Sequence, residues 1–393
     1  MTWLSESGYR VFNPQRFQFP SPQVPILPTR LDIGSGDFGQ GEYTPVTDSK
    51  NYQFFSWGRY ALLEAFRLSN VGPGGYVLIP AYHCRTMLDP ALSLQSEIRL
   101  YPLNAELSPD IPAIEALILE SKLPIRALLA THYFGFPQSL DRLKALCNKH
   151  EIVLIEDCSH AFIRSRVDMK TGALGTFVVA SPYKFCPTMD GGVLIGNGVE
   201  LTRELIGRGL FDEVSSAVRL LTRARVRKHA LLGTKSPLAE IIEKDGDHSW
   251  EDGRGISSAY DPASTSLRGY RLSHWIVRHS SADRIARQRR ENFSKWLAGV
   301  DALPGCRPLY SDLPDGVVPY MFPLYLDRPL PDFYGLKNQG LPIWRWDSMG
   351  ISGCAIATDY RLHLLHLPCH QDIGGQEITW MLETLEQVLK RLR

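Results

Sequence analysis

Phe-Val-Val-Ala-Ser-Pro-Tyr-Lys-Phe-Cys-Pro-Thr-Met-Asp-Gly-Gly, at residues 177–192, carries one lysine, Lys184, between an apolar run and a turn-rich segment that ends in two glycines. A second apolar run, residues 152–155, is followed by Glu-Asp-Cys-Ser-His at 156–160. Both runs have the length and composition of buried strands. The sequence therefore places one lysine and one acid, Asp157, each at the end of a buried strand.

Short apolar runs alternate with helical stretches around these two segments. The predicted strands are 76–79, 98–103, 127–130, 153–155, 178–180, 193–195, 321–326 and 340–344, and the predicted helices are 111–121, 138–150, 272–297 and 376–393. Strands that alternate with helices predict an α/β fold in three layers, with a mostly parallel sheet covered on both faces. Such sheets bind ligands beyond the carboxyl ends of their strands, where His132, Asp157 and Lys184 are expected to lie.

The same alternation predicts how the chain is divided. We expect an N-terminal arm at 1–50, because this part is rich in proline and glycine and shows little periodicity. A large ligand-binding domain is expected at 51–255, and a smaller C-terminal α/β domain at 256–393. A polar stretch at 245–265 is predicted to form a long loop.

Composition excludes several classes of protein. The chain has 393 residues and a formal net charge of +1, so no global field favours nucleic acid or an anionic membrane. Its seven cysteines have no paired spacing, and the N-terminus lacks the pattern of a signal peptide, so we expect a cytoplasmic protein without a membrane span. The basic segment 219–228 predicts a solvated or subunit-contacting face, with a membrane or phosphate role as the alternative.

A lysine and an acid, such as Lys184 and Asp157, are the two groups that an enzyme with the cofactor pyridoxal 5'-phosphate requires. A lysine beside apolar neighbours loses hydration, which lowers the pKa of its amine and frees it to hold the cofactor aldehyde as a Schiff base. An acid at a buried strand end needs a partner, and a protonated pyridine nitrogen supplies one. The alternatives are a surface lysine and an aspartate that caps a helix. The pair predicts a pyridoxal-phosphate site in which both residues are catalytic.

Further residues are candidates for binding this cofactor. Gly58 and Arg59 open a predicted helix whose first N–H groups could bind the phosphate, although many helices begin with glycine. Ser181 offers a hydroxyl close to the lysine. His160, shortly after the acid, is predicted as a catalytic residue that donates to the ring oxygen of the cofactor. A packed core histidine is the alternative for His160.

The aromatic residue that stacks on the cofactor ring is expected just after the predicted strand 76–79. Tyr82 and His83 both qualify, and the sequence does not choose between them. Arg345 could bind a substrate carboxylate in a bidentate manner, or it could form an ion pair with Asp347.

The histidines and cysteine near the C-terminus suggest a metal site only at first sight. They are His363, His366, Cys369 and His370. Their spacing fits no standard zinc site, and Pro368 interrupts a helix that would align them. We therefore expect no metal.

Taken together, these segments resemble the DegT-type family of pyridoxal-phosphate-dependent sugar aminotransferases, which has the aspartate-aminotransferase-like fold type I. The resembling stretches are 58–62, 77–82, 132–135, 155–160, 181–184, 190–192 and 289–293. The resemblance implies that Lys184 is the Schiff-base lysine, that Asp157 holds the pyridine nitrogen, and that His160 lies near the ring hydroxyl. It also implies that Gly58, Arg59 and Ser181 surround the phosphate, and that the protein is a homodimer with sites at the subunit interface.

Three features depart from the family pattern. The serine precedes the lysine by only three residues, whereas many family members place it farther away. Residues 264–271 lack the asparagine that reaches the phosphate of the neighbouring subunit. The position of the stacking aromatic aligns nearer Cys84, which leaves Tyr82 or His83 to replace it.

The function implied by the resemblance is transfer of an amino group from an amino acid, glutamate or glutamine, to a keto-sugar or a similar carbonyl acceptor. Such a reaction belongs to polysaccharide or secondary-metabolite biosynthesis. A sugar dehydratase or lyase with the same cofactor is one alternative, and a non-catalytic regulator that binds the cofactor is another. The identity of the acceptor remains open.

Overall fold

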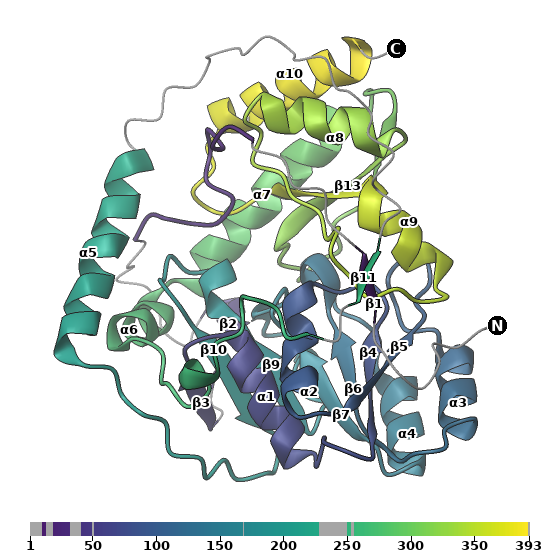
Figure 1. Ribbon diagram of the computed structural model, residues 1–393. Coiled ribbons are helices and arrows are strands. Elements are labelled where there is room, and N and C mark those ends of the chain that lie inside the picture. The colour runs from purple at the N-terminus through teal and green to yellow at the C-terminus, as the bar shows by residue number, and fades with distance from the viewer. Residues whose placement is uncertain are drawn as a thin grey trace.

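The computed structural model describes residues 10–12, 19–31, 41–48, 51–167, 169–227, 250–252 and 255–391. Their centre is a seven-stranded sheet with the order β3-β10-β9-β7-β6-β4-β5 (Figure 1). The bounds are β3 (Tyr52–Phe55), β4 (Tyr76–Pro80), β5 (Glu97–Tyr101), β6 (Ile125–Thr131), β7 (Val153–Asp157), β9 (Phe177–Ala180) and β10 (Gly192–Gly196). The pairs from β5 to β9 are parallel, and β10 is antiparallel to both of its neighbours. This mostly parallel sheet confirms the predicted fold class.

Helices cover both faces of the sheet, as the alternation in the sequence predicted. These are α1 (Gly58–Leu68), α2 (Asp89–Ser93), α3 (Ile111–Leu119) and α4 (Asp141–Lys149). Successive residues of a strand point to opposite faces, so Val77 and Leu129 pack with α1 and α2, whereas Leu78 and Leu128 pack with α3 and α4. Two layers of helix therefore bury the sheet and leave its edges for ligands.

A smaller sheet, β12-β13-β14, lies beyond the large one and carries the C-terminal helices (Figure 1). Its elements are β12 (Cys306–Pro308), β13 (Met321–Leu326), β14 (Leu364–Pro368), α7 (Ala282–Val300), α8 (Pro329–Asn338), α9 (Ala355–His363) and α10 (Gly375–Arg391). One cluster of buried apolar side chains extends from Leu128 in the large sheet to Phe322 in the small one. The predicted domain boundaries, including the arm at 1–50, stay predictions.

Further strands and helices lie outside these two sheets and their covering helices. They are β1 (Arg10–Phe12) paired with β11 (Trp250–Asp252), β2 (Tyr43–Pro45) paired with β8 (Ile163–Ser165), and the helices α5 (Leu210–Arg227) and α6 (Arg271–His279). The basic residues at 219–227 lie on α5, and Lys228 lies outside the described residues. Of the predicted loop at 245–265, residues 245–249 and 253–254 also lie outside them, and the rest forms β11 and an irregular segment with one short 3₁₀ turn, Pro262–Ser264. Within the described ranges, no helix has both the length and the apolar character that a membrane span requires.

Two sequence predictions need correction. The helix predicted at 272–297 is interrupted, because Ser280 adopts an extended backbone and the Ser281 hydroxyl accepts the N–H of Arg284 at 3.3 Å, which starts α7. Serine favours such N-caps. The strand predicted at 340–344 forms only an isolated bridge between Trp344 and His366, and β14 is the strand that pairs with β13.

Candidate active site

The ends of β7 and β9 bring the two predicted catalytic groups to one edge of the large sheet. Asp157 is the last residue of β7 and pairs with Val179 of β9. Lys184 follows β9 in the short 3₁₀ turn η3 (Pro182–Lys184). Burial lowers the pKa of Lys184 from its ordinary value, and the nearby carboxylate of Asp157 partly offsets this effect. The structure therefore places the lysine and the acid within electrostatic reach of each other.

The backbone around Lys184 is fixed while its amine faces an aromatic side chain. The Lys184 N–H donates to the carbonyl of Ser181 at 3.1 Å, and the Arg289 guanidinium donates to the Lys184 carbonyl at 2.8 Å. Its Nζ lies 5.3 Å from the centre of the Tyr320 ring. These contacts contradict the alternative of a solvated surface lysine, because an exposed side chain would have neither the aromatic neighbour nor the lowered pKa.

Asp157 is nearly buried, and its carboxylate is oriented by the chain that follows it. The Ser159 N–H donates to Asp157 Oδ1 at 2.8 Å, and the Cys158 N–H donates to the Val179 carbonyl at 2.8 Å. No helix begins in the described residues that follow directly, 158–167, so the alternative of a helix cap is excluded. The carboxylate is thus held at the strand end for another partner.

His160 lies in the same neighbourhood and is buried. Its ring stacks on Tyr320 with the centroids 4.3 Å apart, and its Nδ1 accepts the N–H of Phe134 at 3.3 Å. Burial lowers the pKa of His160 well below its ordinary value, and the positive charge of Lys184 lowers it further. The imidazole is therefore neutral, and Nδ1 acts as an acceptor. Its predicted role at the cofactor ring stays a prediction.

The N-terminus of α1 meets the segment before the lysine at Gly58. A Cβ atom built on Gly58 would lie 2.3 Å from Ser181 Oγ, so glycine is required for this close approach. Ser181 Oγ in turn lies 3.0 Å from Ser159 Oγ. Trp57, the residue before the helix, makes no side-chain capping hydrogen bond. The first N–H groups of α1 and the hydroxyls of Ser181 and Ser159 thus lie close together, and such a group of donors suits a phosphate.

Arg59 contributes to this space through its backbone. Its guanidinium contacts the carbonyl of Ala259 and lies 5.8 Å from the centre of the Trp57 ring. The side chain is therefore committed to neighbouring protein groups, and the N–H at the start of the helix is the part of Arg59 that could contact a phosphate.

Gly192 is the second of the two glycines that end the segment 177–192, and no larger side chain fits at this position. A Cβ on Gly192 would lie 2.2 Å from the backbone carbonyl of Trp57 and 2.5 Å from the nitrogen of Gly58. Glycine at this position therefore lets β10 lie directly against the start of α1.

Tyr82 and His83 are fully buried and bonded to other parts of the protein. The Tyr82 hydroxyl lies 2.9 Å from Nε2 of His366, and His83 Nε2 accepts the N–H of Gly350 at 3.1 Å. Burial lowers the pKa of His83 to about 4. The residue after His83 is Cys84, which is half-buried and couples electrostatically with Lys184. The cofactor-stacking role of Tyr82 or His83 stays a prediction, without a contact in its support.

Sequence reasoning missed Tyr320 and treated His366 only as a metal ligand to be rejected. Tyr320 directly precedes β13 and His366 lies on β14, both more than 130 residues after Lys184. Even so, the Lys184 amine lies 5.3 Å from the centre of the Tyr320 ring and couples electrostatically with His366. Burial lowers the pKa of His366 to about 3, and Lys184 lowers it further. In the sequence, the cluster of histidines around residue 366 was the one pattern that could have indicated that this segment lies near Lys184.

Arg345 forms the ion pair with Asp347 that the sequence analysis gave as the alternative to substrate binding. Its Nε lies 3.7 Å from a carboxylate oxygen of Asp347, and its guanidinium lies over the ring of Phe333 at 4.2 Å. Both contacts lie within the C-terminal part of the chain and hold Arg345 there.

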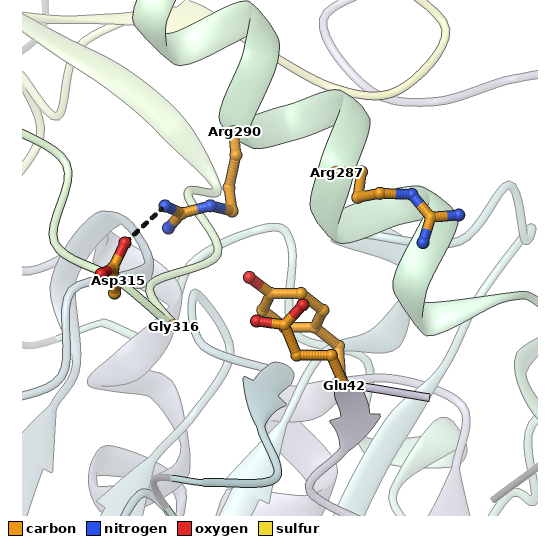
Figure 2. Close-up of a pocket in the computed structure, with 6 residues that line it drawn as sticks. Glu42, Arg287, Arg290, Asp315 and Gly316 are labelled. Atoms are coloured by element: carbon orange, nitrogen blue, oxygen red, sulfur yellow. Dashed lines mark ion pairs between the residues drawn. The ribbon is translucent and has the colours of Figure 1, made fainter. Parts of the chain in front are cut away.

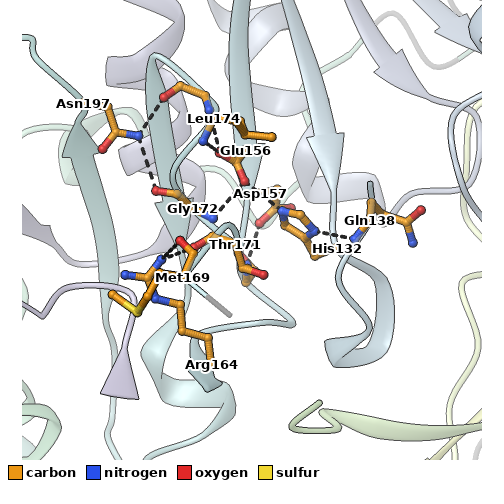
Figure 3. A network of polar contacts seen from close by, with 12 residues as sticks. His132, Gln138, Glu156, Asp157, Arg164, Met169, Thr171, Gly172, Leu174 and Asn197 are labelled. Atoms are coloured by element: carbon orange, nitrogen blue, oxygen red, sulfur yellow. Dashed lines mark hydrogen bonds and ion pairs between the residues drawn. The ribbon is translucent and has the colours of Figure 1, made fainter. Parts of the chain in front are cut away.

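Glu156, the neighbour of Asp157, is the centre of a separate buried network (Figure 3). Its two oxygens accept the N–H groups of Gly172, Leu174 and Gly175 at 2.5–2.8 Å. His132 Nε2 donates to the same carboxylate at 3.0 Å. Burial alone would raise the pKa of Glu156, but these hydrogen bonds outweigh it and leave the pKa below its ordinary value. The network fixes the loop before β9.

This network also explains a group of residues that could be taken for a metal site. His132, Glu156 and Cys158 have ligand atoms within 4.8 Å of one another. However, the carboxylate already accepts four hydrogen bonds, and His132 Nδ1 accepts the N–H of Gln138 at 2.9 Å. Protein contacts therefore account for both His132 and Glu156.

An open polar pocket of about 520 Å³ lies elsewhere, between β2 and α7 (Figure 2). It is lined by Glu42, Tyr43, Arg287, Arg290, Asp315 and Gly316. Arg290 is paired with Asp315 at 3.6 Å, and positive and negative groups are balanced on its walls. The pocket shares no residue with the Lys184 site and offers no nucleophile or acid–base pair.

Comparison with known proteins relates part of the chain to one family. Residues 54–241 match the profile of the DegT/DnrJ/EryC1/StrS aminotransferase family. The matched segment makes up slightly less than half of the chain. It contains Lys184, Asp157 and the start of α1, so the resemblance seen in the sequence is confirmed.

Curated relatives match over part of their length. A dTDP-3-amino-3,4,6-trideoxy-alpha-D-glucose transaminase of Streptomyces venezuelae is 28% identical over 207 residues, which are 51% of each chain. A UDP-N-acetyl-3-dehydro-alpha-D-glucosamine 3-aminotransferase of Acidithiobacillus ferrooxidans is 27% identical over 50% of this chain and 53% of its own. The chain thus spans about half the length of the curated relatives that it matches.

Solved structures match over most of the chain. The aminotransferase TlmJ of Streptoalloteichus hindustanus aligns with a TM-score of 0.59 at 20% identity, over 87% of this chain and 86% of its own. DesV of S. venezuelae aligns with a TM-score of 0.60 at 16% identity, over 90% and 92%. At this level of identity, the likeness shows a shared fold.

Proposed function

We propose that this protein is a pyridoxal-phosphate-dependent aminotransferase that moves an amino group from glutamate or glutamine to a keto-sugar or a similar carbonyl acceptor. The observation that carries the proposal is the meeting of Lys184, Asp157 and the N-terminus of α1 at one sheet edge. The family of residues 54–241 and the names of the relatives, which are transaminases of sugars and of an inosose, support this reaction and these substrate classes.

The residues at the sheet edge fit the parts of this cofactor. Gly58, the backbone of Arg59, Ser159 and Ser181 would hold the phosphate, since Gly58 lies directly against Ser181 Oγ, which is 3.0 Å from Ser159 Oγ. Asp157 would face the pyridine nitrogen with a carboxylate that Ser159 orients. When bound, the cofactor supplies an electron-poor ring that can stabilise negative charge on an adjacent substrate carbon.

Lys184 is the group that would hold the cofactor aldehyde and transfer protons. Burial lowers the pKa of its amine, so a larger fraction is neutral near pH 7 than in an exposed lysine. A neutral Nζ can accept a proton from the substrate carbon and later return it. Positioned proton transfer of this kind contributes about 10²–10⁴-fold to a rate.

His160 would act at the side of the cofactor as a neutral imidazole. Its Nδ1 accepts the N–H of Phe134, which fixes the tautomer that carries a proton on Nε2. That N–H is then a donor for a ring oxygen of the cofactor, as the sequence analysis predicted.

Absorbance spectroscopy tests the proposal. The purified protein titrated with pyridoxal phosphate should develop the visible band of a lysine-bound cofactor, and the Lys184→Ala variant should not. Addition of L-glutamate or L-glutamine should then convert the bound cofactor to its amine form. A wild-type protein that binds no pyridoxal phosphate would overturn the proposal.

A non-catalytic cofactor-binding protein is a second candidate, and Cys84 favours it. This thiol couples electrostatically with Lys184 from the position where the family resemblance would have placed an aromatic residue. Such a protein would bind the cofactor but would not react with any amino donor. A dehydratase or lyase would also leave the cofactor unconverted by glutamate, and release of water or ammonia from its own substrate would identify it.

The proposal includes a homodimer and a cytoplasmic location. The homodimer follows from the family resemblance and predicts a mass of about twice 44.3 kDa by light scattering. The cytoplasmic location rests on the unpatterned set of seven cysteines in the sequence.

A further inference from the structure

Tyr320 is held rigidly at the edge of the Lys184 site. It directly precedes β13, its N–H donates to the Phe134 carbonyl at 2.7 Å, and its carbonyl accepts from the Arg289 guanidinium at 2.9 Å. Its ring stacks on His160, and Lys184 Nζ lies 5.3 Å from the ring centre. The direction of the phenol is therefore fixed by backbone and ring contacts together.

The Tyr320 hydroxyl is buried without a hydrogen-bond partner among the described residues. Five described tyrosines are less than 2% exposed: Tyr60, Tyr82, Tyr101, Tyr133 and Tyr320. The hydroxyls of the other four are bonded to Asp261, His366, Leu129 and Tyr82 in that order. Buried polar groups are normally paired, and an unpaired one in a native structure requires an explanation.

The surroundings of this hydroxyl point to a ligand as that explanation. Its electrostatic neighbours include Cys84, which also couples with Lys184, and Tyr183, the residue before Lys184. A second buried atom near the lysine, His366 Nδ1, also has no partner among the described residues. Burial raises the pKa of Tyr320 well above its ordinary value, so the phenol keeps its proton and remains a donor.

We propose that the Tyr320 hydroxyl donates a hydrogen bond to an oxygen atom of the substrate bound next to Lys184. The inference rests on the proposed function and adds a substrate-binding residue that comes from the small sheet. Tyr320 and the neutral His366 are uncharged, so this side of the site suits carbonyl and hydroxyl oxygens. The amino donor and the carbonyl acceptor occupy the same place in turn, so an amino donor can serve as the probe.

The test compares Tyr320→Phe with Tyr101→Phe as a matched control. Tyr101 is equally buried, but its hydroxyl donates to the Leu129 carbonyl at 2.8 Å, away from the lysine. The probe is L-glutamate or L-glutamine, whichever converts the cofactor bound to the wild type. The readouts are the donor concentration that gives the half-maximal rate of cofactor conversion in a single half-reaction, the affinity for pyridoxal phosphate, and urea unfolding without the cofactor.

For Tyr320→Phe we expect the donor concentration for the half-maximal rate to rise about tenfold, as for the loss of one hydrogen bond to the bound donor. We expect the affinity for pyridoxal phosphate to change less than about twofold, and the unfolding constant not to rise, because no hydrogen bond within the protein is lost. Tyr101→Phe should raise the unfolding constant about fivefold and leave the donor concentration unchanged.

An unchanged donor concentration in Tyr320→Phe would overturn the inference. A tenfold loss of cofactor affinity would also overturn it, since Tyr320 would then bind the cofactor. If the unfolding constant of Tyr320→Phe rose as much as that of Tyr101→Phe, Tyr320 would have a structural role instead. If the wild type itself binds no pyridoxal phosphate, the proposed function fails first, and the titration of the wild type shows this separately.

Discussion

Glu156 and Asp157 are consecutive carboxylates at the end of β7, but their surroundings differ. Glu156 accepts four hydrogen bonds, from His132, Gly172, Leu174 and Gly175 (Figure 3). The Asp157 carboxylate accepts the N–H of Ser159 and couples electrostatically with Lys184, Tyr133 and Tyr183. Because successive strand residues point to opposite faces, one carboxylate fixes the fold while the other is left for chemistry.

Asp157→Asn should have the largest effect on activity. The amide keeps an oxygen for the Ser159 N–H, so the fold is preserved, but the negative charge at the site is lost. We expect the rate of amino transfer to fall about 10²–10³-fold, as for other preorganised electrostatic groups, with little change in unfolding. Single-turnover kinetics and urea denaturation would measure the two effects. Equal activity of variant and wild type would contradict the difference between the two carboxylates.

Glu156→Gln should have the opposite profile. The glutamine side chain would point an NH₂ group at backbone N–H groups that now donate to the carboxylate. His132 would lose the charged oxygen to which its Nε2 donates. We expect the free energy of unfolding to fall by about 3 kcal/mol, because buried donors would lose hydrogen bonds to a charged acceptor. Urea denaturation at pH 7 measures the loss. A stable variant with lost activity would reverse the roles assigned to the two residues.

The pH dependence of stability should sharpen this contrast. The folded-state pKa of Glu156 lies below its ordinary value of 4.5, because hydrogen bonds from His132 and from backbone N–H groups outweigh burial. Folding therefore favours the ionised form, and this stabilisation is present above pH 4.5 and lost as the pH falls through the folded pKa. Below about pH 4.5, the wild type should lose unfolding free energy more steeply than Glu156→Gln. Parallel pH profiles would contradict the assignment.

The smallest expected effect concerns the phosphate space next to Asp157. Gly58→Ala would place a methyl group against Ser181 Oγ and should weaken pyridoxal-phosphate binding about tenfold, which is about 1.4 kcal/mol. Gly207→Ala is the matched control, since a Cβ there meets no atom within 4 Å. Fluorescence titration with the cofactor compares the two variants. Equal affinities would show that this space does not hold the phosphate.

Much of the fold and part of the site could be predicted from local sequence. The apolar runs before Asp157 and Lys184 identify their strands, and parallel strands bring both residues to one edge. The contributions of Tyr320 and His366 could not be predicted, because they depend on how a distant sheet packs against this edge. The separate roles of Glu156 and Asp157 were equally hidden, since the loop at 172–175 that saturates Glu156 has no signature in the sequence.

The central claim is that the amine of Lys184 bonds covalently to pyridoxal phosphate. Reduction of the cofactor-treated protein with borohydride, followed by peptide mass spectrometry, tests it most directly. The account predicts a phosphopyridoxyl adduct on the peptide that contains Lys184 and none on that peptide in Lys184→Ala. An adduct on another lysine, or no adduct in the wild type, would contradict it.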